Sequence, residues 1–186
     1  MITTTVHFYN SINMDTAILF RNLCLNAILK QPRQPDNLNI MFSSPGGNVN
    51  AGITIYEFLR TLPIPVTMCN VGSVESISCI VFLGANDRIA MPNTHFKLHG
   101  FEWTFPQPNI AYSGIVDAYV SINNDVERCA NIFEERTIGA PRSIDFRECF
   151  RGNPIILGVN EAYNAGITTA DAGAVKLALP GVHIYP

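Results

Sequence analysis

The chain has 186 residues, of which 47% are hydrophobic and 15% charged, and its formal net charge is −3. This length predicts one globular domain spanning residues 1–186, and the acidic balance argues against nucleic acid or an anionic membrane as the main partner. Neither a signal peptide nor an apolar run of membrane-spanning length is evident, so we expect a cytoplasmic protein.

Strand and helix patterns alternate along the chain. We expect strands at residues 3–9, 38–43, 65–71, 88–90 and 95–98, helices at 15–29, 49–62, 76–85, 115–136 and 160–165, and an end strand at 182–185. Asp15 is expected to cap the first helix. Strands that alternate with helices indicate βαβ units and an α/β fold with a largely parallel sheet.

Polar residues gather where three of these strands end. Ser44-Pro45-Gly46-Gly47 follows the second strand, GSVES follows the third, and His99 ends a later one. In parallel sheets the carboxyl ends of the strands carry the ligand and catalytic groups. We therefore expect these three segments to meet at one edge.

Each of the three segments also has a purely structural interpretation. Two glycines after a strand form a tight turn as readily as they supply backbone donors. Ser73 is expected in the turn and Ser76 at the start of the next helix, where a serine serves either as a cap or as a nucleophile. His95 and His99 share one face of a strand, but no third ligand at a suitable spacing accompanies them, so we expect no metal or other cofactor.

Taken together, the motifs resemble the Clp protease proteolytic subunit family. The matching stretches are FSSPGGNVNAGITIYEFL, VGSVESISCIVFLGAN, RIAMPNTHFKLHG and NEAYNAGITTA, and the similarity runs from about residue 4 to residue 169. The resemblance implies a Clp protease/crotonase-like fold of repeated βαβ units with a protruding handle helix, here within residues 106–140. It also implies a serine endopeptidase that cleaves peptides or unfolded proteins inside a ring-shaped chamber.

The resemblance assigns roles to individual positions. Ser76, which lies 29 residues after Gly47, matches the nucleophile, and His99 matches the general base. The backbone N–H groups of Gly47 and Ile77 match the oxyanion donors. An acyl-enzyme mechanism would follow, in which the serine attacks the peptide carbonyl and the two amides stabilise the resulting oxyanion.

Three features depart from the family pattern. The aspartate of the triad is missing, and the nearest replacement is Asn153, with Asp145 and Glu148 as alternatives. Glu75 replaces a small residue before the serine, either as a solvent-facing turn charge or as a cleft residue that repels acidic substrates. The family implies stacked heptameric rings and an AAA+ unfoldase partner, but the chain starts almost at the first strand, which argues against the unfoldase.

Two alternative functions stay open at this point. The missing aspartate is compatible with a catalytically silent Clp-like protein that serves assembly. A crotonase-type acyl-CoA enzyme would explain the glycines, although it leaves the pairing of Ser76 with His99 without a purpose, and no basic cluster for a CoA phosphate is evident.

Overall fold

Strands and helices alternate through most of the protein, as the sequence pattern predicted. The computed structural model describes residues 2–105 and 109–170. Its elements are β1 Thr3–Tyr9, α1 Met14–Leu29, β2 Asn37–Ser44, α2 Val49–Thr61, β3 Val66–Glu75, α3 Ser78–Leu83, β4 Asp87–Ala90, β5 His95–Leu98, α4 Tyr112–Arg136, α5 Phe146–Arg151, β6 Ile155–Gly158 and α6 Val159–Asn164. The expected end strand at residues 182–185 lies outside the described residues.

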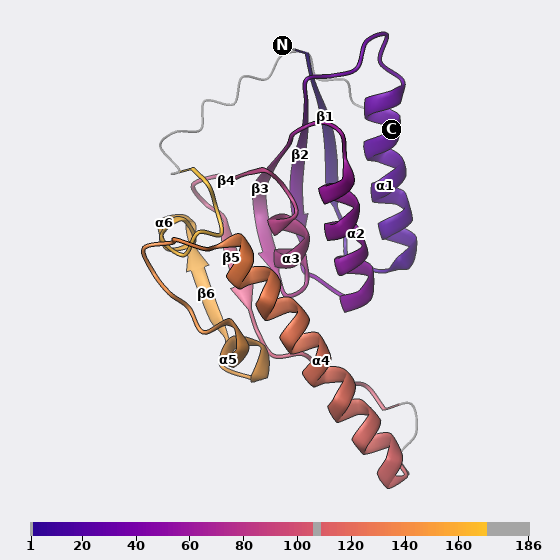
Figure 1. Cartoon of the computed structure of the whole chain (residues 1–186), viewed down its shortest axis with the longest axis vertical. Coiled ribbons are helices and arrows are strands. Elements are labelled where there is room, and N and C mark those ends of the chain that lie inside the picture. The colour runs from indigo at the N-terminus through magenta and orange to yellow at the C-terminus, as the bar shows by residue number, and fades with distance from the viewer. Residues whose placement is uncertain (1, 106–108, 171–186) are drawn as a thin grey trace.

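The strands form one mixed sheet in the order β1-β2-β3-β5-β6, and β4 pairs with the first part of β3. All pairings are parallel except the one between β5 and β6, which is antiparallel. In Figure 1, helices α1, α2 and α3 lie along one side of this sheet. The prediction of an α/β fold with a largely parallel sheet is therefore confirmed.

The core lies between the sheet and these helices and is rich in phenylalanine. Side chains of β2 alternate strictly between half-buried and buried, which is the period of a strand with one face packed against helices. Phe8 packs edge-on against Phe20 of α1 at a ring separation of 5.1 Å, and Phe82 of α3 lies 5.0 Å from Phe96 of β5. Each such ring contributes about 2–3 kcal/mol by leaving water.

The start of α1 differs from the prediction that Asp15 caps it. Asn13 is the cap: its backbone is extended, and its side chain accepts a hydrogen bond of 2.9 Å from the backbone N–H of Thr16. The Thr16 hydroxyl accepts in turn from the N–H of Asn13, which completes a reciprocal capping box. Asp15 lies inside the first turn, where its charge favours the helix dipole.

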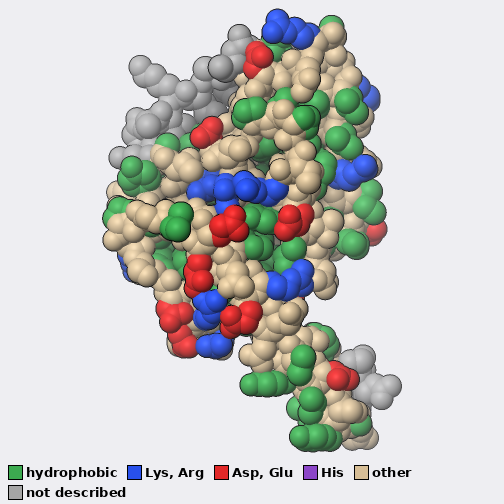
Figure 2. All heavy atoms as spheres, viewed as in Figure 1, with side chains coloured by type: hydrophobic (Ala, Val, Ile, Leu, Met, Phe, Trp, Pro, Cys, Tyr) green, Lys and Arg blue, Asp and Glu red, His purple; other side chains and the backbone are tan. Residues whose placement is uncertain are grey.

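Helix α4 projects away from the body of the molecule (Figure 1). It begins at Tyr112, three residues before the expected start. Most of its buried side chains lie in its second half. Large apolar residues near its first turns are exposed, and Tyr112 reaches 83%. Figure 2 shows several apolar side chains on the same projecting end. An exposed apolar surface of this kind indicates a contact with another protein surface.

Two short elements, α5 and β6, were not predicted. Helix α5 is held against α4 by Arg147, which forms ion pairs with Glu127 and Glu134 and a hydrogen bond of 2.8 Å to Asn131. Elements of six and four residues are too short to show a hydrophobic period, so their sequence signal is weak. Together they form the flank of the molecule beside β5.

Arg88 holds the last described residues to the body. Its guanidinium is buried and donates to the carbonyls of four residues, Ala85, Arg136, Gly166 and Ile167, at 2.8–3.2 Å. Burial lowers the pKa of this side chain to about 10. Among the helices of residues 2–105 and 109–170, none is long and apolar enough to cross a membrane.

Candidate active site

Strand β3 continues further than the sequence indicated and carries the first part of the GSVES segment. The expected end of this strand was residue 71, but pairing extends to Glu75 because Ser73, Val74 and Glu75 align with β5. Ser73 is therefore a strand residue opposite His95, and its predicted place in a turn is wrong. Glu75 is likewise a strand residue and not a turn charge.

Ser76 occupies the turn that follows β3, with a backbone conformation rare for a side chain of its type. Its φ of 56° lies in the left-handed region, and among the described residues no other non-glycine residue has a positive φ. Its N–H donates to the Lys97 carbonyl at 2.8 Å, which fixes the turn against β5. Backbone strain of this kind costs about 1–3 kcal/mol and concentrates at functional sites.

The Ser76 hydroxyl is unbonded within the described part of the chain, although the residue is only 8% exposed. The expectation that Ser76 opens the helix is wrong by two residues, because α3 begins at Ser78 and Ile77 is its N-cap. A capping role would have used the serine oxygen. In this structure the Ser76 hydroxyl oxygen does not cap the helix, so it is available to react.

Ser78 stabilises this turn through its hydroxyl group. Its hydroxyl lies 2.6 Å from the Glu75 carbonyl and 3.0 Å from the Ser44 carbonyl, so it links the end of β3 to the end of β2. Its place in the helix agrees with the prediction. Cys79 is held similarly, with its sulfur 3.2 Å from the Val74 carbonyl, and burial raises the pKa of its thiol far above the ordinary value. A buried protonated thiol is not a nucleophile.

The Gly46-Gly47 loop lies directly against this turn. Gly46 has a φ of 91°, and a Cβ placed on it would lie 2.7 Å from both the Ser76 Cβ and the Glu75 carbonyl oxygen. Gly47 has a φ of 144°, and a Cβ there would collide with the Ile12 carbonyl. Only glycine fits these two positions, because both the backbone angle and the available space exclude a side chain.

Two backbone N–H groups beside Ser76 have no acceptor in the described residues. They belong to Gly47 and Ile77, the two positions matched to oxyanion donors. The neighbouring amides are bonded: Gly46 N–H donates to Ser44 Oγ at 3.1 Å, and Asn48 N–H donates to the Ile12 carbonyl at 2.8 Å. Unpaired amides within a bonded loop are what an anion-binding site requires.

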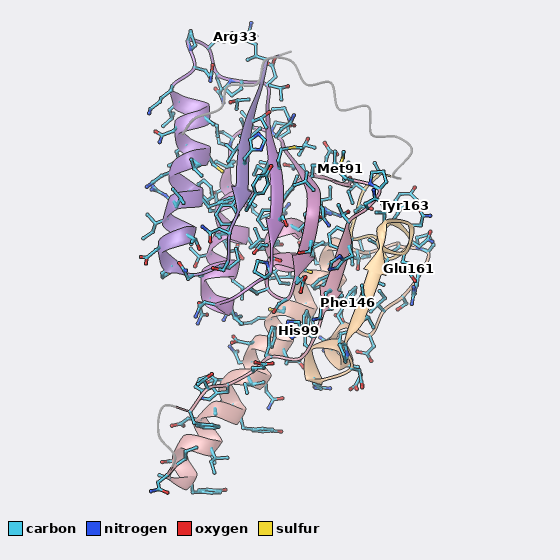
Figure 3. The ribbon with its side chains drawn as sticks, turned by 180° about the vertical axis from the view of Figure 1, so that it is seen from behind. Arg33, Met91, His99, Phe146, Glu161 and Tyr163 are labelled. Carbon is cyan, nitrogen blue, oxygen red and sulfur yellow. The ribbon has the colours of Figure 1, made fainter. Side chains whose placement is uncertain are left out.

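His99 lies just beyond β5, half-buried, at the end of the sheet near the point where α4 leaves the body (Figure 3). Its Nδ1 is 2.8 Å from the Gly100 carbonyl oxygen, an acceptor, so Nδ1 carries the proton in this contact. That tautomer leaves the Nε2 lone pair available. Within residues 2–105 and 109–170, His99 and Ser76 do not form a direct hydrogen bond.

The side chain of Asn153 makes no hydrogen bond to His99 in the described residues and bonds to Glu148. Its side-chain amide donates to Glu148 Oε2 at 3.0 Å, and the residue is exposed. The preceding residue, Gly152, lies against Gly100, where an added Cβ would be 3.2 Å from the Gly152 Cα. The segment containing Asn153 is therefore adjacent to His99, while the partner of the His99 Nδ1 is a backbone carbonyl.

The two alternative carboxylates are committed to α5. Asp145 is the N-cap of that helix and accepts from the Glu148 N–H at 3.0 Å. Glu148 accepts from Asn153 and lies 3.6 Å from the Arg151 guanidinium. Neither carboxylate contacts His99 in the described structure.

His95, the second histidine of the strand, pairs with Glu75 across the sheet. The imidazole Nε2 lies 3.3 Å from Glu75 Oε1. No group of three or more histidine, cysteine, aspartate or glutamate residues arranged for a metal ion occurs in the part of the chain that the structure describes. The pair is a hydrogen-bonded contact beside the serine.

The sequence did not indicate that the Gly100 carbonyl accepts a hydrogen bond from His99, or that Ser44 and Ser78 stabilise the turns on either side of the site. The available signals were the glycine directly after His99 and the glycine directly before Asn153. Gly100 and Gly152 allow their two segments to approach closely, but such a pair produces no periodic sequence pattern. Their contact is therefore visible only in the folded structure.

Comparison with known proteins identifies the family of the chain. The family model described as Clp protease matches residues 3–167. ATP-dependent Clp protease proteolytic subunit 3 of Rhizobium etli is 27% identical over 97 residues, which cover 51% of this chain and 48% of that protein. The proteolytic subunit of Oltmannsiellopsis viridis is 28% identical over 161 residues, covering 83% of this chain and 77% of that protein.

The fold comparison gives the same result. A mutant of ClpP1 from Listeria monocytogenes, in which an asparagine is replaced by an aspartate, superimposes with a TM-score of 0.71 and 25% identity, covering 89% of this chain and 88% of that one. The chain spans less than half of the length of the first curated relatives it matches. The family match over nearly all described residues places the chain in the Clp protease family.

Proposed function

We propose that this protein is a serine-type endopeptidase that cleaves peptides or unfolded proteins by acyl-enzyme chemistry. The observation that carries the proposal is the set of unbonded groups around one turn. The Ser76 hydroxyl and the N–H groups of Gly47 and Ile77 all lack partners in the described structure, although the surrounding backbone is hydrogen-bonded. A nucleophile and two oxyanion donors require this arrangement.

The tautomer of His99 supports its role as the general base. Because Nδ1–H donates to the Gly100 carbonyl, Nε2 is the nitrogen able to accept the Ser76 proton. The hydroxyl oxygen then attacks the peptide carbonyl carbon, and the proton passes from His99 to the leaving amine. Water hydrolyses the resulting ester by the same two proton transfers. Direct contact between the two side chains is expected to form when substrate binds.

The oxyanion would receive both free amides. The Ile77 N–H follows the nucleophile directly, and the Gly47 N–H comes from the loop that packs against it. In proteases of this chemical class, one such donor contributes about 3 kcal/mol to the transition state. The absence of side chains at residues 46 and 47 lets a peptide approach the backbone closely.

Asn153 is our proposed third member, acting through His99. The support for this role is the position of its neighbour Gly152, which lies against Gly100, the residue after His99. The alternative is a Ser76–His99 dyad whose imidazole is held by the Gly100 carbonyl, and the hydrogen bond of 2.8 Å between His99 Nδ1 and that carbonyl supports it.

Assembly into a ring is the second part of the proposal. The exposed apolar end of α4 supports a homo-oligomer, since Tyr112, Tyr119 and Val120 would otherwise remain in water. We expect two stacked heptameric rings that enclose the active sites. Whether an AAA+ unfoldase feeds this chamber is a separate question that co-sedimentation with such an ATPase would answer.

A fluorophosphonate probe with intact-mass detection tests the chemistry. We expect a single adduct on the parent protein, none on Ser76→Ala, and an adduct on Ser73→Ala, because Ser73 lies in β3 with its backbone paired to β5. Hydrolysis of a fluorogenic peptide should follow the same order. A parent protein without adduct or hydrolysis would instead be the silent assembly protein that the missing aspartate suggests.

A further inference from the structure

Glu75 lies immediately before the proposed nucleophile and on the side of the sheet that faces away from α3. Along β3, Val74 is fully buried while Ser73 and Glu75 are half-buried. Along β5 the same alternation buries Phe96 and Leu98. Because side chains alternate between the two faces of a strand, Glu75 shares its face with the other half-buried positions of β5.

That second face carries His95, Lys97 and, one step beyond the strand, His99. The register pairs Glu75 directly with Lys97, and Ser76 N–H donates to the Lys97 carbonyl. A peptide whose carbonyl meets Ser76 and whose leaving nitrogen meets His99 would lie over this end of β5. It would pass close to Glu75, the residue before Ser76, whose carboxylate reaches back along β5 to His95.

The charge of Glu75 is only partly matched by its surroundings. Its carboxylate contacts His95 at 3.3 Å, and the side chain keeps 25% of its surface exposed while that of His95 keeps 41%. Lys97, although opposite in register, makes no ion pair with it in the described residues. The Glu75 carboxylate is therefore partly accessible to a cation of the substrate.

We infer that Glu75 makes the site selective for peptides with lysine or arginine next to the scissile bond, and that it disfavours acidic residues there. The inference rests on the proposed function. A carboxylate one residue from the nucleophile lies within about 10 Å of the reacting carbon, which is the screening length at 0.1 M salt. An arginine guanidinium also fits a carboxylate in a bidentate manner, so arginine should be preferred over lysine.

The test measures kcat/KM for peptide sets that differ only in one residue near the scissile bond: arginine, glutamine or glutamate. We expect the parent to prefer arginine over glutamate roughly tenfold, and Glu75→Gln to lose most of that ratio. Glu57→Gln is the matched control, because Glu57 is an exposed carboxylate on α2, on the opposite side of the sheet. It changes the net charge equally and should keep the parent ratio.

Salt provides a second measurement that needs no variant. Raising the ionic strength to about 1 M shortens the screening length to about 3 Å and should reduce the preference of the parent. Fluorophosphonate labelling, which is independent of peptide charge, reports on the nucleophile in each sample. Labelling and hydrolysis without an arginine preference, or with a preference that Glu75→Gln retains, would overturn the inference and leave the peptidase standing. Failure of fluorophosphonate labelling in the parent would refute both the charge preference and the proposed peptidase activity.

Discussion

Replacing Gly46 by alanine should separate the geometry of the active site from the stability of the fold. The φ of 91° at this position costs a residue with a side chain about 1–2 kcal/mol. The new Cβ would lie 2.7 Å from the Ser76 Cβ, whereas ordinary contact begins near 3.4 Å, so one of the two must move by about 0.7 Å. Such overpacking costs about 1–3 kcal/mol more.

The effect on catalysis should exceed the effect on folding. The group that must move is the turn carrying the proposed nucleophile, and a displacement approaching 1 Å typically lowers the rate about 10²-fold. We therefore expect kcat/KM for a fluorogenic peptide to fall by about 10², while urea denaturation reports a stability loss of about 2–5 kcal/mol. The fluorophosphonate labelling rate of Ser76 should fall in parallel.

Gly139→Ala is the control that makes this measurement decisive. Gly139 has a similar φ of 82°, but a Cβ there would meet nothing within 4 Å. It should lose the same 1–2 kcal/mol of backbone strain and retain activity. Equal kcat/KM in the two alanine variants would show that the Gly46 loop does not position the nucleophile, and our account of the site would be wrong.

Two further predictions concern groups outside the turn. Arg88→Met should lower the free energy of unfolding in urea by about 3 kcal/mol or more, because four carbonyls lose a charged donor. The control Arg33→Met, at an exposed position, should be nearly neutral in the same assay. Asn153→Ala should lower kcat with little change in KM, and Asn153→Asp should match or exceed the kcat of the parent. Asp145→Ala and Glu148→Ala should keep a kcat near that of the parent. A large loss of kcat in either of these two variants alone would transfer the role to that carboxylate.

The sequence predicted the framework because its signals are periodic. Residues 3–9 alternate and form β1 as expected, and the expected helix at residues 49–62 appears as Val49–Thr61. Glycine and proline marked the end of β2 to within one residue, because the strand includes Ser44. The predicted Clp protease resemblance is confirmed by the family model, which matches residues 3–167.

The turn at Ser76 could not be predicted in the same way. A polar stretch after an apolar strand usually ends it, but here Ser73 and Glu75 continue the strand because β5 supplies pairing partners from 22 residues further along the chain. Tertiary pairing therefore overrode the local signal. The antiparallel strand β6 was missed for a related reason: four residues are stabilised by pairing with β5 and not by their own pattern.

In the proposed mechanism, the missing aspartate should have a smaller effect than its absence from the sequence suggests. In serine proteases, replacing the triad carboxylate by an amide lowers turnover by about 10⁴, mainly because the imidazole takes the wrong tautomer. In this protein the Gly100 carbonyl already fixes the proton on His99 Nδ1, so the correct tautomer does not depend on a carboxylate. What is lost is the charge that stabilises the imidazolium in the transition state. In the proposed mechanism, a neutral carbonyl or the amide of Asn153 would orient the base without supplying that charge, and a larger share of the rate enhancement would then rest on the amides of Gly47 and Ile77.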